Sequence, residues 1–153
     1  MNELQQVNEF LSVTGADFIR RVHELQDFLI NQMPAEHHTE MPVKHHFAHK
    51  TYVREMFSPA GSIVIGKTHR YDHTCIVLTG RAIVYSEHGV KEISAPFTFH
   101  SERGAKRLFV VLEDLTFQTV HYAEPDDLAA IEQDLIVPDS EVEQFRKDQN
   151  MEI

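Results

Sequence analysis

Histidine is the most conspicuous chemical feature of this sequence. The chain of 153 residues has 11 histidines, against four tyrosines and no tryptophan. Neutral imidazole is the commonest metal ligand in proteins, and histidine is the side chain that titrates closest to pH 7. We therefore ask first whether some of these histidines can converge on one site.

Three basic residues have a spacing that favours such a site. Lys67, His69 and His73 share parity, so on one regular strand they would face the same way. His100 would then come from a neighbouring strand. Histidines from two adjacent strands can supply three neutral imidazoles to one divalent metal and leave open positions for water or substrate.

The same residues resemble the two motifs of the cupin (RmlC-like) superfamily of β-barrels. The frame of the first motif runs through Gly61, Lys67, His69, His73 and Gly80. The frame of the second motif runs through Gly89, Ala95 and His100. The motif resemblance covers roughly residues 50–122. The general character of the sequence is also similar to that of small cupin-like proteins encoded by tailed phages.

The cupin resemblance implies a double-stranded, jelly-roll β-barrel with the metal ligands His69, His73 and His100. The cofactor would be a divalent transition metal: Fe, Zn, Ni, Mn or Cu. The sequence departs from the family at Lys67, which stands where a metal histidine is expected, and at His73, which replaces a glutamate. His46 and His121 are additional candidate ligands that could replace the missing one.

Other residues of the predicted barrel are candidates for binding a ligand. Lys67 cannot bind a metal while protonated, so it either turns outward or contacts an anionic substrate; if it does neither, no metal is bound. Arg107 could hold a carboxylate or phosphate in a bidentate manner, and Tyr52 and Tyr85 could donate hydrogen bonds in the lumen. Cys75 lies in an apolar run and is expected to be a buried small hydrophobe.

The elements that must position these residues are short strands. Eight runs rich in β-branched and aromatic residues are separated by turn signals, such as Thr79-Gly80 and Glu113-Asp114. The runs are 51–57, 62–65, 75–78, 82–85, 90–93, 97–100, 107–112 and 115–122. The gaps between them are too short for crossover helices, so we predict a mainly β barrel over residues 43–122.

Helical patterns flank the predicted barrel. Residues 1–42 form a helical N-terminal extension and linker, in which Phe18, Val22, Leu25 and Leu29 make one apolar stripe. This stripe is expected to pack on the barrel; the alternative is a dimerisation arm, and a homodimer is the expected oligomer. Residues 123–153 form C-terminal helices.

Charge and composition exclude several classes of function. Fourteen basic against 24 acidic residues give a net charge of −10, which argues against a nucleic-acid partner or an anionic membrane surface. The single cysteine excludes an intrachain disulfide. No apolar run is long enough to span a membrane, and the expected location is the cytoplasm, that of the host if the protein is phage-encoded.

Three hypotheses of function follow. In the first, the barrel binds one divalent metal and a small anionic molecule, whether or not it catalyses a reaction; cupins include dioxygenases, isomerases, lyases and proteins without catalysis. In the second, it is a metal-free module that binds or sequesters a small molecule such as a sugar or nucleotide. In the third, it is a structural or assembly protein, such as a phage component, with a non-catalytic barrel.

Overall fold

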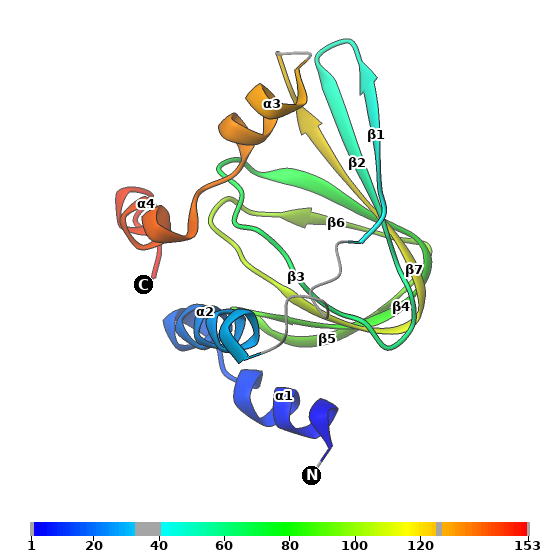
Figure 1. Ribbon diagram of the computed structural model, residues 1–153. Coiled ribbons are helices and arrows are strands. Elements are labelled where there is room, and N and C mark those ends of the chain that lie inside the picture. Colours follow the sequence, from blue (N-terminus) through cyan, green and yellow to red (C-terminus); the bar gives the residue numbers. More distant parts are fainter. Residues whose placement is uncertain (1, 33–40, 125–126, 153) are drawn as a thin grey trace.

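The computed structural model describes residues 2–32, 41–124 and 127–152 of the chain. Within these residues, seven strands form one antiparallel sheet that curls into a barrel, and short helices flank it at both ends (Figure 1). The strands are β1 (Val43–Ala48), β2 (Thr51–Ser58), β3 (Ile63–Ile65), β4 (His73–Ser86), β5 (Gly89–Ser94), β6 (Phe97–Ser101) and β7 (Leu108–Tyr122). The helices are α1 (Glu3–Leu11), α2 (Gly15–Gln32), α3 (Leu128–Leu135), a 3₁₀ turn (Asp139–Glu141) and α4 (Val142–Asp148). The predicted fold class is confirmed, while part of the predicted linker, residues 33–40, lies outside the described residues.

Two long strands, β4 and β7, run through the whole barrel and pair with each other along most of their length. The first half of β4 also pairs with β6 and its second half with β5. The first part of β7 pairs with β3 and its second part with β2. The predicted count of eight runs was therefore wrong at two places: 75–78 and 82–85 are both parts of β4, and 107–112 and 115–122 are both parts of β7.

The point where β4 bends coincides with the turn signal at Thr79-Gly80. The β4–β7 register shifts three times between Val77 and Ala82, so the chain bulges there instead of turning back. Gly80 has a φ of +92°, and a Cβ on it would lie 2.2 Å from the carbonyl oxygen of Asp114 on β7. Only glycine fits this close approach of two backbones, which lets one strand serve both faces of the barrel.

The side chains of β4 alternate between two cores. Val84 belongs to the apolar cluster inside the barrel, together with Val77 and Phe117. The next residue, Tyr85, faces outward and packs with the helices α1 and α2, as expected for successive residues of a strand. Phe18 and Val22 of α2 are buried in this outer cluster, so the prediction that the helix packs on the barrel is confirmed.

The C-terminal helices hold a loop at the mouth of the barrel. After α3, Ile136 forms a bridge with His69, and the backbone N–H of Val137 donates to the carbonyl of Thr68 at 2.9 Å. Arg146 of α4 is 1% exposed and donates to both carboxylate oxygens of Glu87, at 3.2 and 2.8 Å. Because these bonds tie the C-terminal segment to the barrel, they also fix the loop of residues 66–72 between β3 and β4.

None of the described helices combines the length and the apolar character that a membrane crossing by a helix requires.

We predict that Gly80→Ala destabilises the protein more than Gly61→Ala does. Gly61 has nearly the same φ, +90°, but no atom lies within 4 Å of the position of its Cβ. Both variants place an alanine in the left-handed conformation, and this strain costs about 1–3 kcal/mol of stability. Gly80→Ala adds a backbone clash that we expect to cost about 1–3 kcal/mol more. Urea unfolding of both variants measures the difference, and equal losses would show that the close approach at Gly80 does not constrain the bend.

Candidate metal centre

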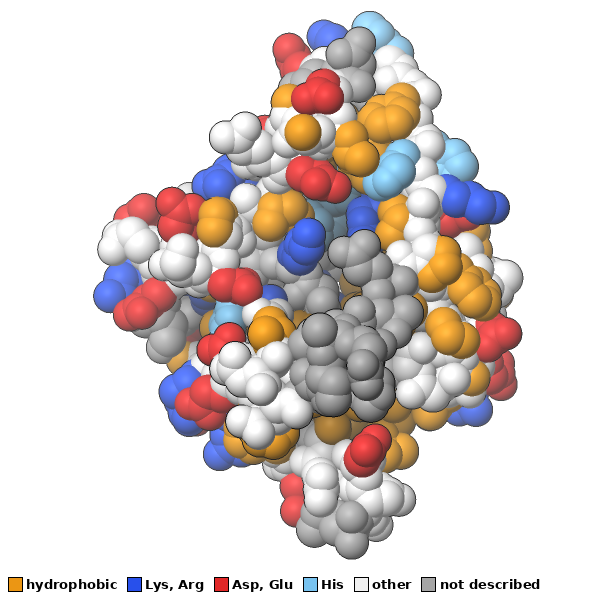
Figure 2. Space-filling view, in the orientation of Figure 1, with side chains coloured by type: hydrophobic (Ala, Val, Ile, Leu, Met, Phe, Trp, Pro, Cys, Tyr) orange, Lys and Arg blue, Asp and Glu red, His pale blue; other side chains and the backbone are white. Residues whose placement is uncertain are grey.

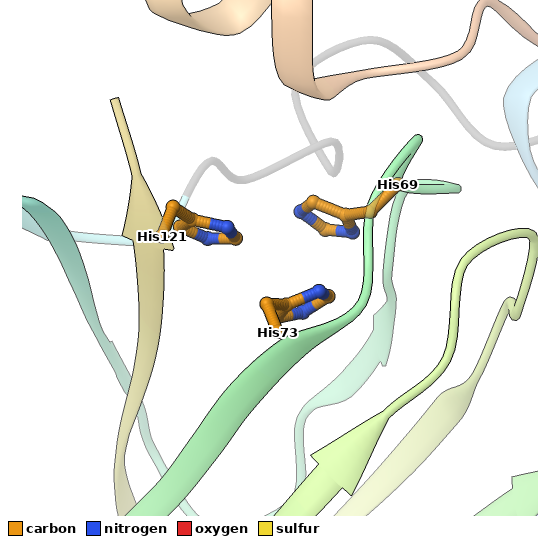
Figure 3. Close-up of side chains that lie close together, drawn as sticks. All are labelled: His69, His73 and His121. Atoms are coloured by element: carbon orange, nitrogen blue, oxygen red, sulfur yellow. The ribbon is translucent and has the colours of Figure 1, made fainter. Parts of the chain in front are cut away.

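Three histidine side chains meet inside the upper part of the barrel. One ring nitrogen from each of His69, His73 and His121 lies within 4.8 Å of those from the other two. The ring centroids are 4.4 Å apart for His69 and His73, 4.6 Å for His73 and His121, and 5.2 Å for His69 and His121. Figure 3 shows the three rings turned toward one another from separate segments of the chain. Small movements of the rings would bring the nitrogens to the usual metal–nitrogen distance of about 2.0–2.1 Å.

The strand register brings two of these histidines together. Thr74 of β4 lies opposite Val120 of β7, so the adjacent residues His73 and His121 meet on the inner face. His69 comes from the loop before β4, where its carbonyl accepts a hydrogen bond from the N–H of Gly104 at 2.9 Å. Its bridge to Ile136 holds the same residue from the other side. The third imidazole therefore depends on contacts with two other segments and not on a strand.

Each ring has one nitrogen that is already hydrogen-bonded. Nδ1 of His73 donates to the carbonyl of Tyr71 at 3.1 Å, and the ring of His69 is hydrogen-bonded to the backbone of Lys67. Nε2 of His121 is hydrogen-bonded to the hydroxyl of Thr119 at 2.8 Å. Partners of this kind fix the orientation and tautomer of metal-binding histidines. The second nitrogen of each ring remains as a potential ligand.

Burial keeps the three imidazoles neutral. Desolvation lowers the pKa of His69 to about 2, with the neighbouring His73 and His121 adding to the effect. Desolvation also lowers the pKa of His121 to about 4 and lowers that of His73 below its ordinary value. A neutral imidazole is the form that binds a metal. At neutral pH the cluster therefore needs no deprotonation to act as a ligand set.

The structure does not bring His100 into this cluster. In β6, His100 lies opposite Thr74, while its neighbour Ser101 lies opposite the inward-facing His73. Since successive residues of a strand face opposite sides, the ring of His100 points outward. Its side chain is 66% exposed and lies 3.3 Å from the carboxylate of Asp72. The cupin resemblance implied the set His69, His73 and His100, whereas the cluster in the structure contains His121 and not His100.

Two other predicted residues also lie away from the three rings. His46 of β1 is 52% exposed, and its Nε2 lies 3.6 Å from the carboxylate of Glu55 on the outer face. Lys67 is exposed, in agreement with the expectation that it turns outward if it binds no substrate. The parity argument that placed it beside His69 and His73 fails, because residues 66–72 leave the strand.

The three remaining candidates for ligand binding, Tyr52, Arg107 and Tyr85, lie in different surroundings. Tyr52 is buried and stacks on His121 at 5.9 Å, and its hydroxyl is hydrogen-bonded to Nδ1 of His45 at 2.7 Å. Arg107 is partly buried, and it donates to the hydroxyl of Ser101 at 2.6 Å. Tyr85 was expected in the lumen but donates to Oδ1 of Asn8 in α1 at 3.0 Å, on the outer face. It therefore belongs to the contact with the helices.

The thiol of Cys75 is buried inside the barrel and is a poor nucleophile. It is buried in the apolar cluster, as predicted. Burial raises the pKa of this thiol to about 12, so the thiolate is scarce at neutral pH. The reactive form of cysteine is the thiolate, which makes a covalent role for this residue unfavourable.

Two polar residues near the rings were not among the predicted site residues. Thr119 precedes His121 by two positions, and Arg54 lies opposite Thr119 in the β2–β7 register. Both face the lumen with Tyr52 and His121. The alternation along β2 gives the signal that could have identified Arg54, because it shares parity with Tyr52 and with the apolar Met56.

Several solved structures are similar to this chain at low identity. No protein family model matches the chain, and no curated protein sequence matches it. KdgF from Halomonas sp. is a similar solved structure, at 17% identity and a TM-score of 0.48 over 60% of this chain and 93% of that one. A predicted oxalate decarboxylase from Thermotoga maritima has 18% identity and a TM-score of 0.47 over 56% and 82% of the two chains. A cupin 2 conserved barrel domain protein from Salinispora arenicola has 13% identity and a TM-score of 0.46 over 67% and 92%.

Solved cupin structures are thus among those similar to this chain, as the resemblance in the sequence predicted. The identities and TM-scores are low, so we infer the chemistry of the site from the residues of this chain alone.

The low pKa of His69 predicts a pH dependence of stability in metal-free protein. The unfolded chain takes up a proton near the ordinary histidine pKa of about 6.5, while folded His69 stays neutral. The free energy of unfolding therefore falls as the pH is lowered below about 7, and His69 contributes about 1–2 kcal/mol of that fall by pH 5.

His69→Gln should accordingly reduce this slope, measured by urea unfolding in the presence of a chelator. His49→Gln, at an exposed position next to β1, is the matched control because it leaves the cluster intact. An unchanged slope in His69→Gln would contradict the burial of a neutral ring at this position.

Proposed function

We propose that this protein binds one divalent transition metal in its barrel through His69, His73 and His121. The observation that carries the proposal is the convergence of three neutral imidazole nitrogens within 4.8 Å. Three imidazoles and no carboxylate make a donor set suited to Zn, Fe, Ni or Cu, in contrast to the oxygen ligands preferred by Mg and Ca.

The surroundings of the rings fit a metal site. The bonds to the backbone of Lys67, the carbonyl of Tyr71 and the hydroxyl of Thr119 orient the three rings independently. Tyr52 stacks on His121 and shields it from solvent on the side of β1. A ring held in this way loses little conformational freedom on binding a metal, which favours affinity.

A site with three protein ligands leaves further positions for a small molecule. When bound, the metal would act there as a Lewis acid or would activate water. The residues of this chain would position the small molecule: the partly buried Arg107 supplies hydrogen-bond donors near His73, and the apolar lumen limits the access of water. A metal-dependent enzyme that acts on a small anionic substrate is the function this arrangement supports best.

We predict that the purified wild-type protein binds about one Zn²⁺ or Co²⁺ per chain after reconstitution. Replacing a ligand should weaken binding by more than the roughly 10–100-fold that loss of an outer hydrogen-bond partner costs. His73→Ala and His121→Ala should therefore lose the metal, as measured by isothermal titration calorimetry and elemental analysis.

His100→Ala is the matched control because its ring is exposed and lies outside the cluster. It should retain the metal with unchanged affinity. Wild-type protein that holds no metal would overturn the proposed function. Loss of metal in His100→Ala together with retention in His121→Ala would overturn the ligand set while leaving a metal site in place.

A further inference from the structure

Arg54 of β2 lies on the wall of the lumen next to the three histidines. It lies directly opposite Thr119 in the register, and the hydroxyl of Thr119 is hydrogen-bonded to His121. It shares a face of β2 with Tyr52, which stacks on His121, and with Met56, which is buried in the inner core. Arg54 therefore lies at the edge of the proposed metal centre.

The guanidinium of Arg54 forms no hydrogen bond or ion pair with any side chain in the part of the chain that the structure describes. By contrast, the guanidinium of the buried Arg146 binds a carboxylate and two carbonyl groups. Arg54 is only partly buried, and its nitrogens are not among the buried side-chain atoms that lack a partner in the described residues. The guanidinium is therefore accessible to an acceptor from outside the chain.

A second basic side chain approaches the rings from the residue just before β7, and its charge acts on His73. Arg107 donates to the hydroxyl of Ser101, and Ser101 lies opposite His73 in the β4–β6 register. Its guanidinium also packs over the ring of Phe99, 5.4 Å from the ring centroid. Beside it lies a cavity of about 120 Å³ with apolar and aromatic walls that include Ile93 and Phe97.

The two arginines leave the lumen with an excess of positive charge. The charge of Arg54 contributes to the low pKa of both His69 and His121, and that of Arg107 contributes to the low pKa of His73. Several acidic groups partly offset this charge. Asp72, which is paired with His100 and Arg103, also acts on His73. Glu87 and Glu102 act on Arg107, and Glu132 of α3 acts on Tyr52. A divalent metal would increase the positive charge further. In Figure 2, a histidine surface is visible in a hollow below α3, with Lys or Arg side chains beside it.

We propose that Arg54 binds the carboxylate of a small organic anion beside the histidine cluster, with Arg107 as the second cation of the ligand site. The proposal deepens the metal-centre function proposed above by naming its ligand class and a residue that selects it. A guanidinium presents two parallel N–H groups to a carboxylate, so Arg54 would fix the orientation of the ligand as well as its charge.

The test uses the full chain, both metal-free and loaded with Co²⁺, titrated with malonate, acetate and inorganic phosphate. Calorimetry gives the affinity in both forms, and the visible absorption of Co²⁺ reports ligands that reach the metal. We expect Arg54→Gln to weaken malonate binding at least tenfold, which corresponds to about 1.4 kcal/mol. Arg54→Lys should recover part of this loss, because it restores the charge without the bidentate geometry.

Arg20→Gln is the matched control, since it removes the same side chain from the exposed face of α2. It should bind malonate as the wild type does. Circular dichroism melting of each variant shows that a loss of binding does not reflect unfolding.

The outcomes separate this proposal from the proposed function. If Co²⁺ binds but malonate affinity is the same in wild type and Arg54→Gln, the role of Arg54 is overturned and the metal centre stands. If Co²⁺ does not bind but malonate binding still depends on Arg54, the metal function fails and the anion site stands. Phosphate that binds more tightly than malonate, with the same dependence on Arg54, would overturn the assignment to carboxylates.

Discussion

The close approach of β4 and β7 at Gly80 is the constraint on which the rest of this structure depends. Because the backbone of β4 passes within contact distance of Asp114 there, the two strands stay paired while they bend from one face of the barrel to the other. The half of β4 before the bend carries His73, and the half of β7 after it carries His121. A side chain at residue 80 would push the strands apart and would disturb the register that brings these rings together.

The third ring links the C-terminal helices to the chemistry of the barrel. His69 lies in a loop that pairs with Ile136 and with Gly104, and Arg146 donates to the carbonyl of that same glycine at 2.7 Å. Desolvation of three imidazoles is tolerable because each stays neutral and keeps one hydrogen bond. The helical additions therefore do more than cover apolar surface: the C-terminal one holds a potential metal ligand in place.

Hydrophobic periodicity and turn residues are local signals, and they predicted the class of fold and the flanking helices. The resemblance to the cupin motifs pointed to His69 and His73, and His121 was an additional candidate. The sequence did not distinguish a bulge from a turn at Gly80, since glycine with a positive φ serves both. The exclusion of His100 depends on the register of β6 against β4, in which Ser101 and not His100 lies opposite His73. Tyr85 lies on the outer face because the register shifts between Val77 and Ala82 change which residues of β4 face inward. His69 was named from its spacing, but tertiary contacts with residues 104 and 136 are what place it in the cluster.

The distribution of charge gives the lumen a different character from the chain as a whole. The net charge of −10 is carried by acidic side chains outside the histidine cluster, while Arg54 and Arg107 line the space around it. Electrostatic attraction is strongest where water is scarce, so two guanidinium groups in the lumen outweigh more numerous acids that are screened at the surface. The acidic exterior disfavours large polyanions, which would meet many repulsive charges at once. A small carboxylate can pass these charges and bind inside, which is the selectivity by size and charge that a site with three neutral imidazoles and two arginines would provide.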